Sequence, residues 1–254
     1  MITSKNEAEI AGMRAAGAVV GDTLRMLREL AKPGVRTRTL AKEADRLIRS
    51  RGATPTFRGY QGFPAPICLS LNDQAVHGLP SWRKLADGDI LSIDVGATLN
   101  GFVGDSAITV PIGRVEPRAM ALIDAARDGL HAAIAAARPG AHLGDLGAAV
   151  ERLVRARGFD IVESYCGHGI GHALHEDPQV PNVGTPGTGP VLEAGWCLAI
   201  EPVITMGTAA VVVDSDGWTV RTRDRSLAAH YELAIAVTDD APMILSLTSS
   251  GELP

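Results

Sequence analysis

Two aspartates stand on the arms of a predicted β-hairpin, where they could share a chemical task. Asn100-Gly101 favours a two-residue turn, because a type I′ turn needs positive φ at both central residues. That turn places position 94 opposite position 107. Asp105 is then a diagonal neighbour of Asp94 on the same face of the ladder, within about 7–8 Å. We therefore expect the two carboxylates to lie close enough to share bound ions.

Three predicted strands are largely apolar except for one acidic residue near the candidate site. Asp94 lies in a strand that reads as buried, and a buried carboxylate must be protonated, paired or bound to metal. No Lys or Arg lies between Lys84 and Arg114, so a local ion pair is not available. Glu201 and Glu232 each stand alone in a further apolar strand. The pattern favours metal ligation, and hydrogen-bonded or solvent-exposed carboxylates are the alternative.

A cluster of histidines supplies nitrogen donors. The segment Gly167-His-Gly-Ile-Gly-His-Ala-Leu-His-Glu176 holds His168, His172 and His175 within eight residues. It differs from the HExxH motif, since no glutamate follows the first histidine directly. His77 is a further, isolated candidate. Each histidine alone is more typical of a core or surface position, and the clustering favours a site.

Four carboxylates with one or two imidazoles form an oxygen-rich donor set. Such a set suits Mn²⁺, Fe²⁺, Co²⁺ or Zn²⁺ in a paired site rather than a cysteine-rich structural zinc site. Two such ions, about 3.5–4 Å apart, can deprotonate a bridging water and stabilise the oxyanion formed at a carbonyl. Three scattered cysteines (Cys68, Cys166 and Cys197) predict reduced thiols instead of a disulfide framework.

The elements that must position these residues are predicted from periodicity. Apolar positions at helical spacing predict helices over about 4–30, 39–51 and 116–137. Ser4 and Glu7 suggest a capping box at the first start, and Pro33-Gly34 ends that helix. Between the helix pairs the pattern becomes that of strands, and 178–190 reads as a long ordered loop. The predicted strands are 67–71, 89–96, 102–111, 196–205, 209–213, 219–222 and 231–237.

The helical segments repeat after 106 residues. Ala31-Lys-Pro-Gly34 matches Ala137-Arg-Pro-Gly140, and the Arg-rich segment ending at Gly52 matches the one ending at Gly158. Each copy has two helices followed by strands, which predicts an α+β fold with helices on one face of antiparallel sheet. We expect a single domain over 1–254 with an internal repeat of roughly 4–111 and 116–245. Chance similarity of two Arg-rich helices is the alternative.

Composition sets the broad class and reveals an uneven charge. The chain is 46% apolar and 21% charged, no window approaches a membrane span, and the start lacks the apolar region of a signal peptide. A cytoplasmic monomer is expected. Residues 1–58 carry twelve basic and six acidic side chains, whereas the rest carries twelve basic and 23 acidic. The basic stretch is either a solvated helix face or a weak contact for an anionic partner such as RNA.

Taken in order, these segments resemble type I methionine aminopeptidases. The resemblance rests on HGLP, IDVG, GDSA, GHGIGHALHEDP, IEP and HYELAIAVT, and it extends from about residue 4 to 245. It implies the pita-bread fold, with two pseudo-symmetric halves, a curved antiparallel sheet and helices on its outer face. It also implies hydrolysis of N-terminal methionine from nascent proteins and peptides with a small second residue. Nascent chains and a transient ribosome contact through the basic N-terminal region are the implied partners.

The resemblance also implies a role for each site residue. Two divalent metal ions (Co, Mn, Fe or Zn) would be bound by Asp94, Asp105, His168, Glu201 and Glu232. A water that bridges the ions would attack, with Glu201 as proton shuttle. His77 and His175 would donate hydrogen bonds to the substrate amide and carbonyl. The methionine side chain would occupy a pocket formed by Tyr60, Phe63, Cys68, Leu174 and Trp218.

The chain departs from the family pattern in two places. Phe63 and Leu174 replace the usual Tyr and Phe of the methionine pocket, and the segment often written SAQYEH reads AAHYEL over 228–233. The alternatives to this function are a prolidase or aminopeptidase P, for whose extra N-terminal domain the chain has no room, and a catalytically inactive binding protein. A two-metal phosphoesterase is a third, although no phosphate-binding glycine loop or arginine cluster accompanies the acids.

Overall fold

Four helices form where the periodicity predicts them in the computed structural model, which describes all 254 residues. The prediction of the first cap is wrong by two residues. Asn6 rather than Ser4 caps the helix, because its side chain accepts from the Glu9 N–H while the Glu9 carboxylate accepts from the Asn6 N–H.

No helix combines the length and apolar character needed to cross a bilayer. The helices are α1 Glu7–Leu30, α2 Thr37–Ser50, α3 Pro117–Ala136 and α4 Leu143–Ala156.

The strands form one large and two small antiparallel sheets. The large sheet runs β1-β4-β5-β14-β9-β7-β8, with β2 added to β4 and β15 to β14. The small sheets are β13-β10-β6 and β11-β12-β3. The strands are β1 Thr54–Pro55, β2 Cys68–Leu71, β3 Gln74–Val76, β4 Ile90–Leu99, β5 Phe102–Pro111, β6 Asp160–Ile161, β7 Gly167–Gly169, β8 Glu176–Val180, β9 Cys197–Ile200, β10 Val203–Thr205, β11 Val211–Val213, β12 Val220–Thr222, β13 Ala228–His230, β14 Glu232–Ala236 and β15 Met243–Ile244. A single-turn 3₁₀ helix, η1, covers Tyr60–Gly62.

Every predicted strand segment contains a strand, one segment is divided in two, and seven short strands were not predicted: β1, β3, β6, β7, β8, β13 and β15. The single strand predicted over 196–205 is two strands, β9 and β10, which belong to different sheets. Pro202 lies between them, and proline cannot donate a ladder hydrogen bond. This division comes from pairing with distant strands, which a local pattern does not report. The segment predicted as a loop over 178–190 begins inside β8, which pairs with the neighbouring β7.

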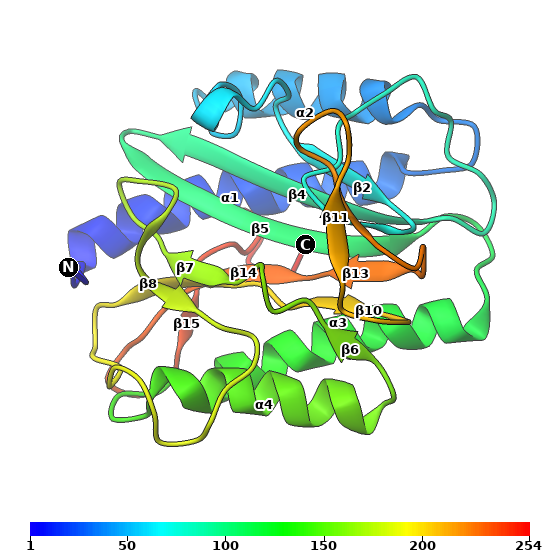
Figure 1. Ribbon diagram of the computed structural model, residues 1–254. Coiled ribbons are helices and arrows are strands. Elements are labelled where there is room, and N and C mark those ends of the chain that lie inside the picture. Colours follow the sequence, from blue (N-terminus) through cyan, green and yellow to red (C-terminus); the bar gives the residue numbers. More distant parts are fainter.

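The large sheet has two faces of different chemistry. On β4, Ile93 and Val95 point into the core shared with α1 and α2, and Asp94 points to the opposite face. On β14, Leu233 and Ile235 point into the core shared with α3 and α4. The two helix pairs lie on either side of the strands in Figure 1, with α2 at the top and α3 and α4 at the bottom. The predicted α+β class with helices outside a curved antiparallel sheet is confirmed.

Matched contacts recur at the 106-residue offset. Arg51 pairs with Asp22 at 2.9 Å in the first helix pair, and Arg157 pairs with Asp128 at 2.8 Å in the second. Helices α2 and α4 have the same length of 14 residues, and the glycines before them, Gly34 and Gly140, have φ of 90° and 83°. We propose on this basis that the chain is one domain built from two related halves.

Helix α1 lies directly on the hairpin that carries the two aspartates. A Cβ atom on Gly104 of β5 would lie 2.6 Å from the backbone nitrogen of Gly17 in α1. Position 104 therefore needs glycine, and the helix backbone packs against the strand without an intervening side chain at this point. This close contact holds β5 in place at the residue before Asp105.

Candidate metal centre

All twelve residues that the sequence analysis assigns to the site line one cavity of about 190 Å³. This volume is below the roughly 300–1,000 Å³ of a pocket for a drug-sized ligand, so it suits one side chain and small ions. One part of the cavity is acidic and the other is apolar and aromatic. The twelve residues are Tyr60, Phe63, Cys68, His77, Asp94, Asp105, His168, Leu174, His175, Glu201, Trp218 and Glu232.

Strand register brings three of the carboxylates together. The predicted hairpin is confirmed, with Asn100 and Gly101 at φ of 50° and 81° and Asp94 opposite Ala107. Ala107 is also the partner of Glu232 on β14. Asp94 and Glu232 therefore flank β5 from its two sides at the same level. Asp105 projects between them from two residues earlier on the same face of β5.

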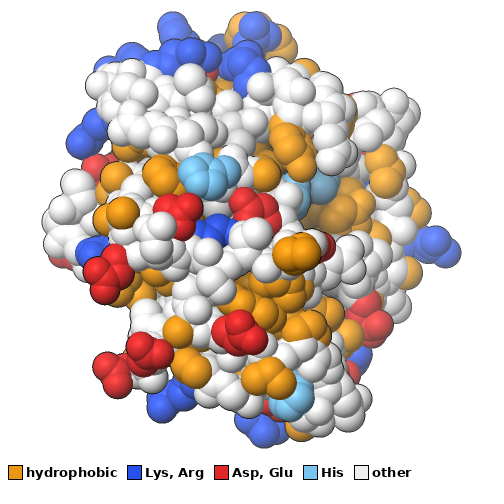
Figure 2. Space-filling view, turned by 90° about the vertical axis from the view of Figure 1, so that its left-hand side faces the viewer, with side chains coloured by type: hydrophobic (Ala, Val, Ile, Leu, Met, Phe, Trp, Pro, Cys, Tyr) orange, Lys and Arg blue, Asp and Glu red, His pale blue; other side chains and the backbone are white.

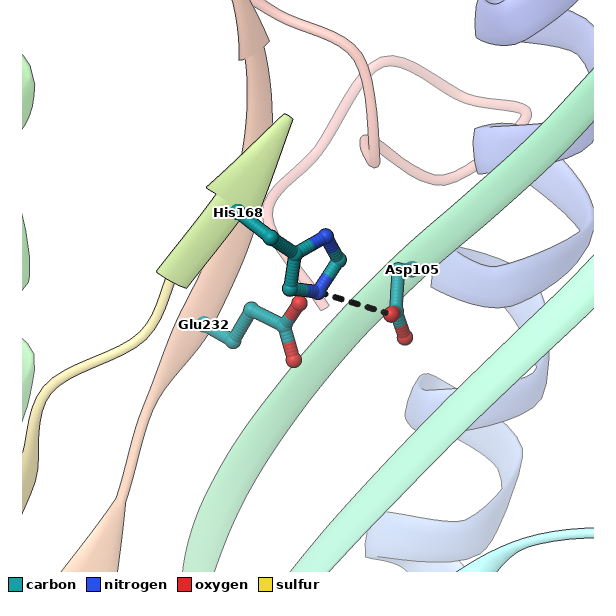
Figure 3. A group of neighbouring side chains, drawn as sticks. All are labelled: Asp105, His168 and Glu232. Carbon is teal, nitrogen blue, oxygen red and sulfur yellow. Dashed lines mark ion pairs between the residues drawn. The ribbon is translucent and has the colours of Figure 1, made fainter. Parts of the chain in front are cut away.

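A second register brings His168 and Glu201 to the same place. His168 on β7 pairs with Ala199 on β9, and Glu201 follows two residues later on the same face. His168 Nε2 lies 3.5 Å from Glu201 Oε1 and 3.9 Å from Asp105 Oδ2. Figure 3 shows His168, Asp105 and Glu232 converging from three strands, with donor atoms that all lie within 4.8 Å of one another.

The hydrogen bond of His168 defines which ring nitrogen faces the acids. Its Nδ1 lies 3.0 Å from the Gly169 carbonyl oxygen, which can only accept, so Nδ1 carries the proton. Burial lowers the pKa of His168 to about 4, so the ring is neutral at pH 7. An unshared electron pair on Nε2 then points at two carboxylates. A cation between them removes the repulsion of this arrangement.

Burial also raises the pKa values of the four carboxyl groups. It raises the pKa of Asp94 to about 7, and it raises the pKa of Asp105, Glu201 and Glu232 well above the usual range, with the neighbouring acids adding to the effect. These directions are what desolvation and like charge produce when no counter-charge is near. Groups whose pKa values are displaced together in one cavity are typical of functional sites.

Three buried carboxylate oxygens lack hydrogen-bond partners, which bears on whether the donor set fits a metal. Asp94 Oδ1, Asp105 Oδ1 and Glu232 Oε1 are buried and have no hydrogen-bond partner. A buried polar atom without a partner costs free energy, and such atoms are rare in folded proteins. Carboxylate oxygens and an imidazole nitrogen are the donors that Mn²⁺, Fe²⁺, Co²⁺ and Zn²⁺ accept. The residues therefore fit divalent ions, and the orphaned oxygens mark where these would bind.

Two further histidines border the acidic part of the cavity. His175 lies with its ring centroid 4.2 Å from that of His168, and its Nδ1 is 2.6 Å from the Tyr60 hydroxyl. His77 has a φ of 57°, a left-handed conformation that costs energy for a residue with a side chain. Its ring lies 5.5 Å from the ring of Tyr165. The strain at His77 indicates that the position of this imidazole matters.

The apolar part of the cavity is formed by aromatic and sulfur-containing side chains. The rings of Phe63 and Trp218 meet edge to face, with centroids 5.1 Å apart. Cys68 pairs with Asp94 across β2 and β4, so the apolar part begins next to the acids. The thiols of Cys68, Cys166 and Cys197 are all free, as predicted.

Sequence reasoning missed several residues at this site. Phe57, Gln61, Tyr165 and Cys166 also line the cavity, and none carries a recognisable motif. His230 is buried next to Glu201, and only its place in the AAHYEL segment could have indicated it. His172, four residues after His168, lies outside the cavity, where its Nδ1 donates a hydrogen bond to the Gly101 carbonyl.

Comparison with known proteins agrees with this arrangement. Residues 11–239 match the family model of metallopeptidase family M24. The methionine aminopeptidase of Clostridium acetobutylicum is 47% identical over 97% of this chain and 99% of its own, and methionine aminopeptidase 1 of Mycobacterium tuberculosis is 49% identical over 97% and 96%. The crystal structure of methionine aminopeptidase from Thermotoga maritima superposes with a TM-score of 0.96, at 41% identity, over 97% of this chain and all of that one.

The raised carboxylate pKa values predict an unusual dependence of stability on pH. Above about pH 7.5, histidines of the unfolded chain are neutral and its carboxylates are ionised. In the metal-free folded protein, burial raises the pKa of Asp94 to about 7 and raises the pKa of the other three acids well above the usual range, so these groups release their protons at higher pH than in the unfolded chain. Because the folded state binds more protons, its free energy of unfolding should fall as pH rises through this range.

Urea unfolding of metal-free protein between about pH 7.5 and 9 measures this effect. Saturating Mn²⁺ should flatten the dependence, since it replaces the protons. Asp94→Asn should also flatten it without metal and should be the more stable protein at the upper pH. A metal-free stability that stays constant or increases over the range would contradict the assignment.

Proposed function

Since the chain belongs to the methionine aminopeptidases of metallopeptidase family M24, we propose that this cavity removes the N-terminal methionine from nascent proteins and peptides. The observation that carries the proposal is the convergence of four buried carboxylates and His168 with unpaired oxygens in one cavity. Divalent metal use follows from the family and the donor set. Nascent chains carry their methionine in the cytoplasm, where we place the activity.

We propose a pair of divalent ions in this site. Asp94, Asp105, His168, Glu201 and Glu232 would hold them, and the family resemblance implies that Asp105 and Glu232 would be the ligands common to both ions. When bound, the ions would supply an activated water and electrostatic stabilisation of charge developing on the scissile carbonyl. Co, Mn, Fe and Zn all suit these ligands, and cellular supply would decide among them.

Glu201 is the residue best placed to carry a proton. Its side chain is 15% exposed, whereas that of Asp105 is 5% exposed, and its pKa is raised by burial and by Asp94. It can accept a proton from the attacking water and deliver it to the leaving amine. His77 and His175 border the same cavity as hydrogen-bond donors to the substrate amide and carbonyl. The Tyr60 hydroxyl orients His175 through Nδ1.

The apolar part of the cavity accommodates the methionine side chain. Phe63, Cys68, Leu174 and Trp218 line it, and thioether sulfur interacts favourably with aromatic rings. The cavity of about 190 Å³ closes around one side chain, so the second residue of the substrate would meet its rim. A small second residue is therefore preferred.

Metal-loaded protein should release methionine from peptides that begin Met-Ala or Met-Gly. A panel that varies the first two residues, assayed with Mn²⁺ or Co²⁺ by free-methionine detection, measures this. Replacing the first residue by Lys or Asp should abolish release, because the pocket offers apolar contacts to that side chain. Absence of release from every methionyl peptide with every divalent metal would refute the function.

Glu201→Gln and His77→Ala should separate proton transfer from substrate orientation. The first should reduce kcat by about 10²–10⁴-fold while the peptide still binds, since the amide cannot accept the proton. The second should reduce turnover and leave metal content unchanged, because His77 is proposed to contact only substrate. Metal content by atomic emission and kcat by initial rates test both. Near-normal kcat in the first variant, or lost metal in the second, would show that the roles are wrong.

A basic surface supports the proposed transient contact with the ribosome. Trp82 is 66% exposed, and the guanidinium carbons of Arg36 and Arg38 lie 5.4 and 4.8 Å from its ring centroid. Neither arginine pairs with a carboxylate. Lys and Arg side chains gather along the top of the molecule in Figure 2, the side on which α2 lies in Figure 1. An exposed aromatic ring beside free cations is a stacking and phosphate-binding surface for RNA.

Single-stranded RNA should therefore bind the protein weakly and lose affinity as salt increases. Trp82→Ala should weaken binding about 5–150-fold, the equivalent of the ~1–3 kcal/mol of one base stack. Arg36→Gln/Arg38→Gln should reduce the salt dependence. Arg46→Gln/Arg49→Gln is the matched control, because these arginines on the same helix pair with Glu43 and Asp45. Fluorescence anisotropy measures the affinities, and equal losses in both double variants would contradict a specific surface.

A further inference from the structure

The chain passes between the large sheet and the β13-β10-β6 sheet at two neighbouring points. Glu201 lies at the first crossing, between β9 and β10, and His230 is the last residue of β13 at the second crossing, before β14 begins. Val203 pairs with His230 in the small sheet, and Ile200 pairs with Leu233 in the large one. The two crossings therefore run side by side, and the His230 imidazole lies next to the Glu201 carboxylate.

His230 is held rigidly by its backbone. Its N–H donates to Thr109 Oγ1 at 2.9 Å, and its carbonyl accepts from the same hydroxyl at 2.8 Å. The residue is 2% exposed. Its Nε2 is fully buried without a hydrogen-bond partner, and it lies 3.7 Å from Glu201 Oε2. A small rotation of either side chain brings this pair within hydrogen-bonding distance.

The neighbours of Nε2 decide which nitrogen carries the proton. A neutral imidazole has one N–H, on either Nδ1 or Nε2. An unshared pair on Nε2 would face the carboxylate oxygen and repel it, whereas an N–H would attract it. The other oxygen of that carboxylate, Oε1, is the one that lies next to His168. Glu201 is thus placed between two imidazoles, one on each oxygen.

We propose that His230 is a positioning residue, whose Nε2–H donates to Glu201 Oε2 and so directs Glu201 Oε1 toward the metal centre. This inference rests on the proposed function of the cavity. The residue that the family pattern SAQYEH places here is glutamine, whose side-chain amide is also a donor. His230 would replace that donor with a ring that has fewer rotatable bonds. Partners that orient a metal ligand typically change metal affinity about 10–100-fold when removed.

The tautomer can be read in the unaltered protein. ¹⁵N-detected spectra of histidine-labelled protein saturated with Zn²⁺, which displaces protons from the carboxyl groups, should show His230 protonated at Nε2. The assignment comes from the signal lost in His230→Gln. An Nδ1-protonated ring would overturn the proposal, because Nε2 could then not donate to Glu201. This measurement does not need turnover.

A substitution series separates hydrogen bonding from packing. His230→Leu fills similar space without a donor, His230→Gln keeps one, and His131→Gln changes a half-buried histidine on α3 outside the cavity. Calorimetric titration with Mn²⁺ should show affinity reduced about 10–100-fold in His230→Leu and restored to within about threefold of wild type in His230→Gln. His131→Gln should match wild type.

Two outcomes of the titration would overturn the proposal. Unchanged affinity in His230→Leu would show that the donor does not matter. Equal loss in His230→Gln and His230→Leu would indicate that the ring itself is a ligand. Should wild type bind Mn²⁺ but release no methionine, the proposed function would fail while the tautomer and the affinities would still decide the role of His230.

Discussion

The structure depends on one constraint: four carboxyl groups are confined to the cavity-lining face of one sheet. Asp94, Asp105, Glu201 and Glu232 lie together without a lysine or arginine, and burial raises the pKa of each. Such an arrangement disfavours the folded state unless protons or cations neutralise it. The same unfavourable electrostatics create affinity for divalent ions, because bound ions relieve the repulsion. Stability and metal binding are therefore linked through one set of atoms.

The remainder of the fold keeps these acids from moving apart. Three ligand-bearing strands are hydrogen-bonded in series, β4 to β5 and β5 to β14, and α1 seats on β5 through Gly17 and Gly104. Apolar residues on the outer face, such as Ile93 and Leu233, anchor the same strands to the two helix pairs. A site that must bind ions and hold water and substrate in order benefits from rigid elements, since less order has to be gained on binding.

The charges of the molecule are divided between two surfaces with different tasks. Four acidic side chains lie together in the cavity, where they would face ions and the amino group of a peptide. Basic side chains lie on α2 and beside Trp82, on the side that would meet a polyanion. The net charge of −5 averages over this division and so describes neither surface.

The candidate ligand types, the Asp94–Asp105 hairpin and the helices could be predicted from the amino-acid sequence, and the family motifs distinguished His168 from His172 as a candidate ligand. The hairpin and the helices depend on local rules: a two-residue turn sets the register between adjacent strands, and apolar spacing sets the helical face. The division of residues 196–205 between two sheets and the position of His230 beside Glu201 could not be predicted in this way. Those outcomes depend on strands that pair across about thirty to more than a hundred residues, and no local pattern specifies that pairing.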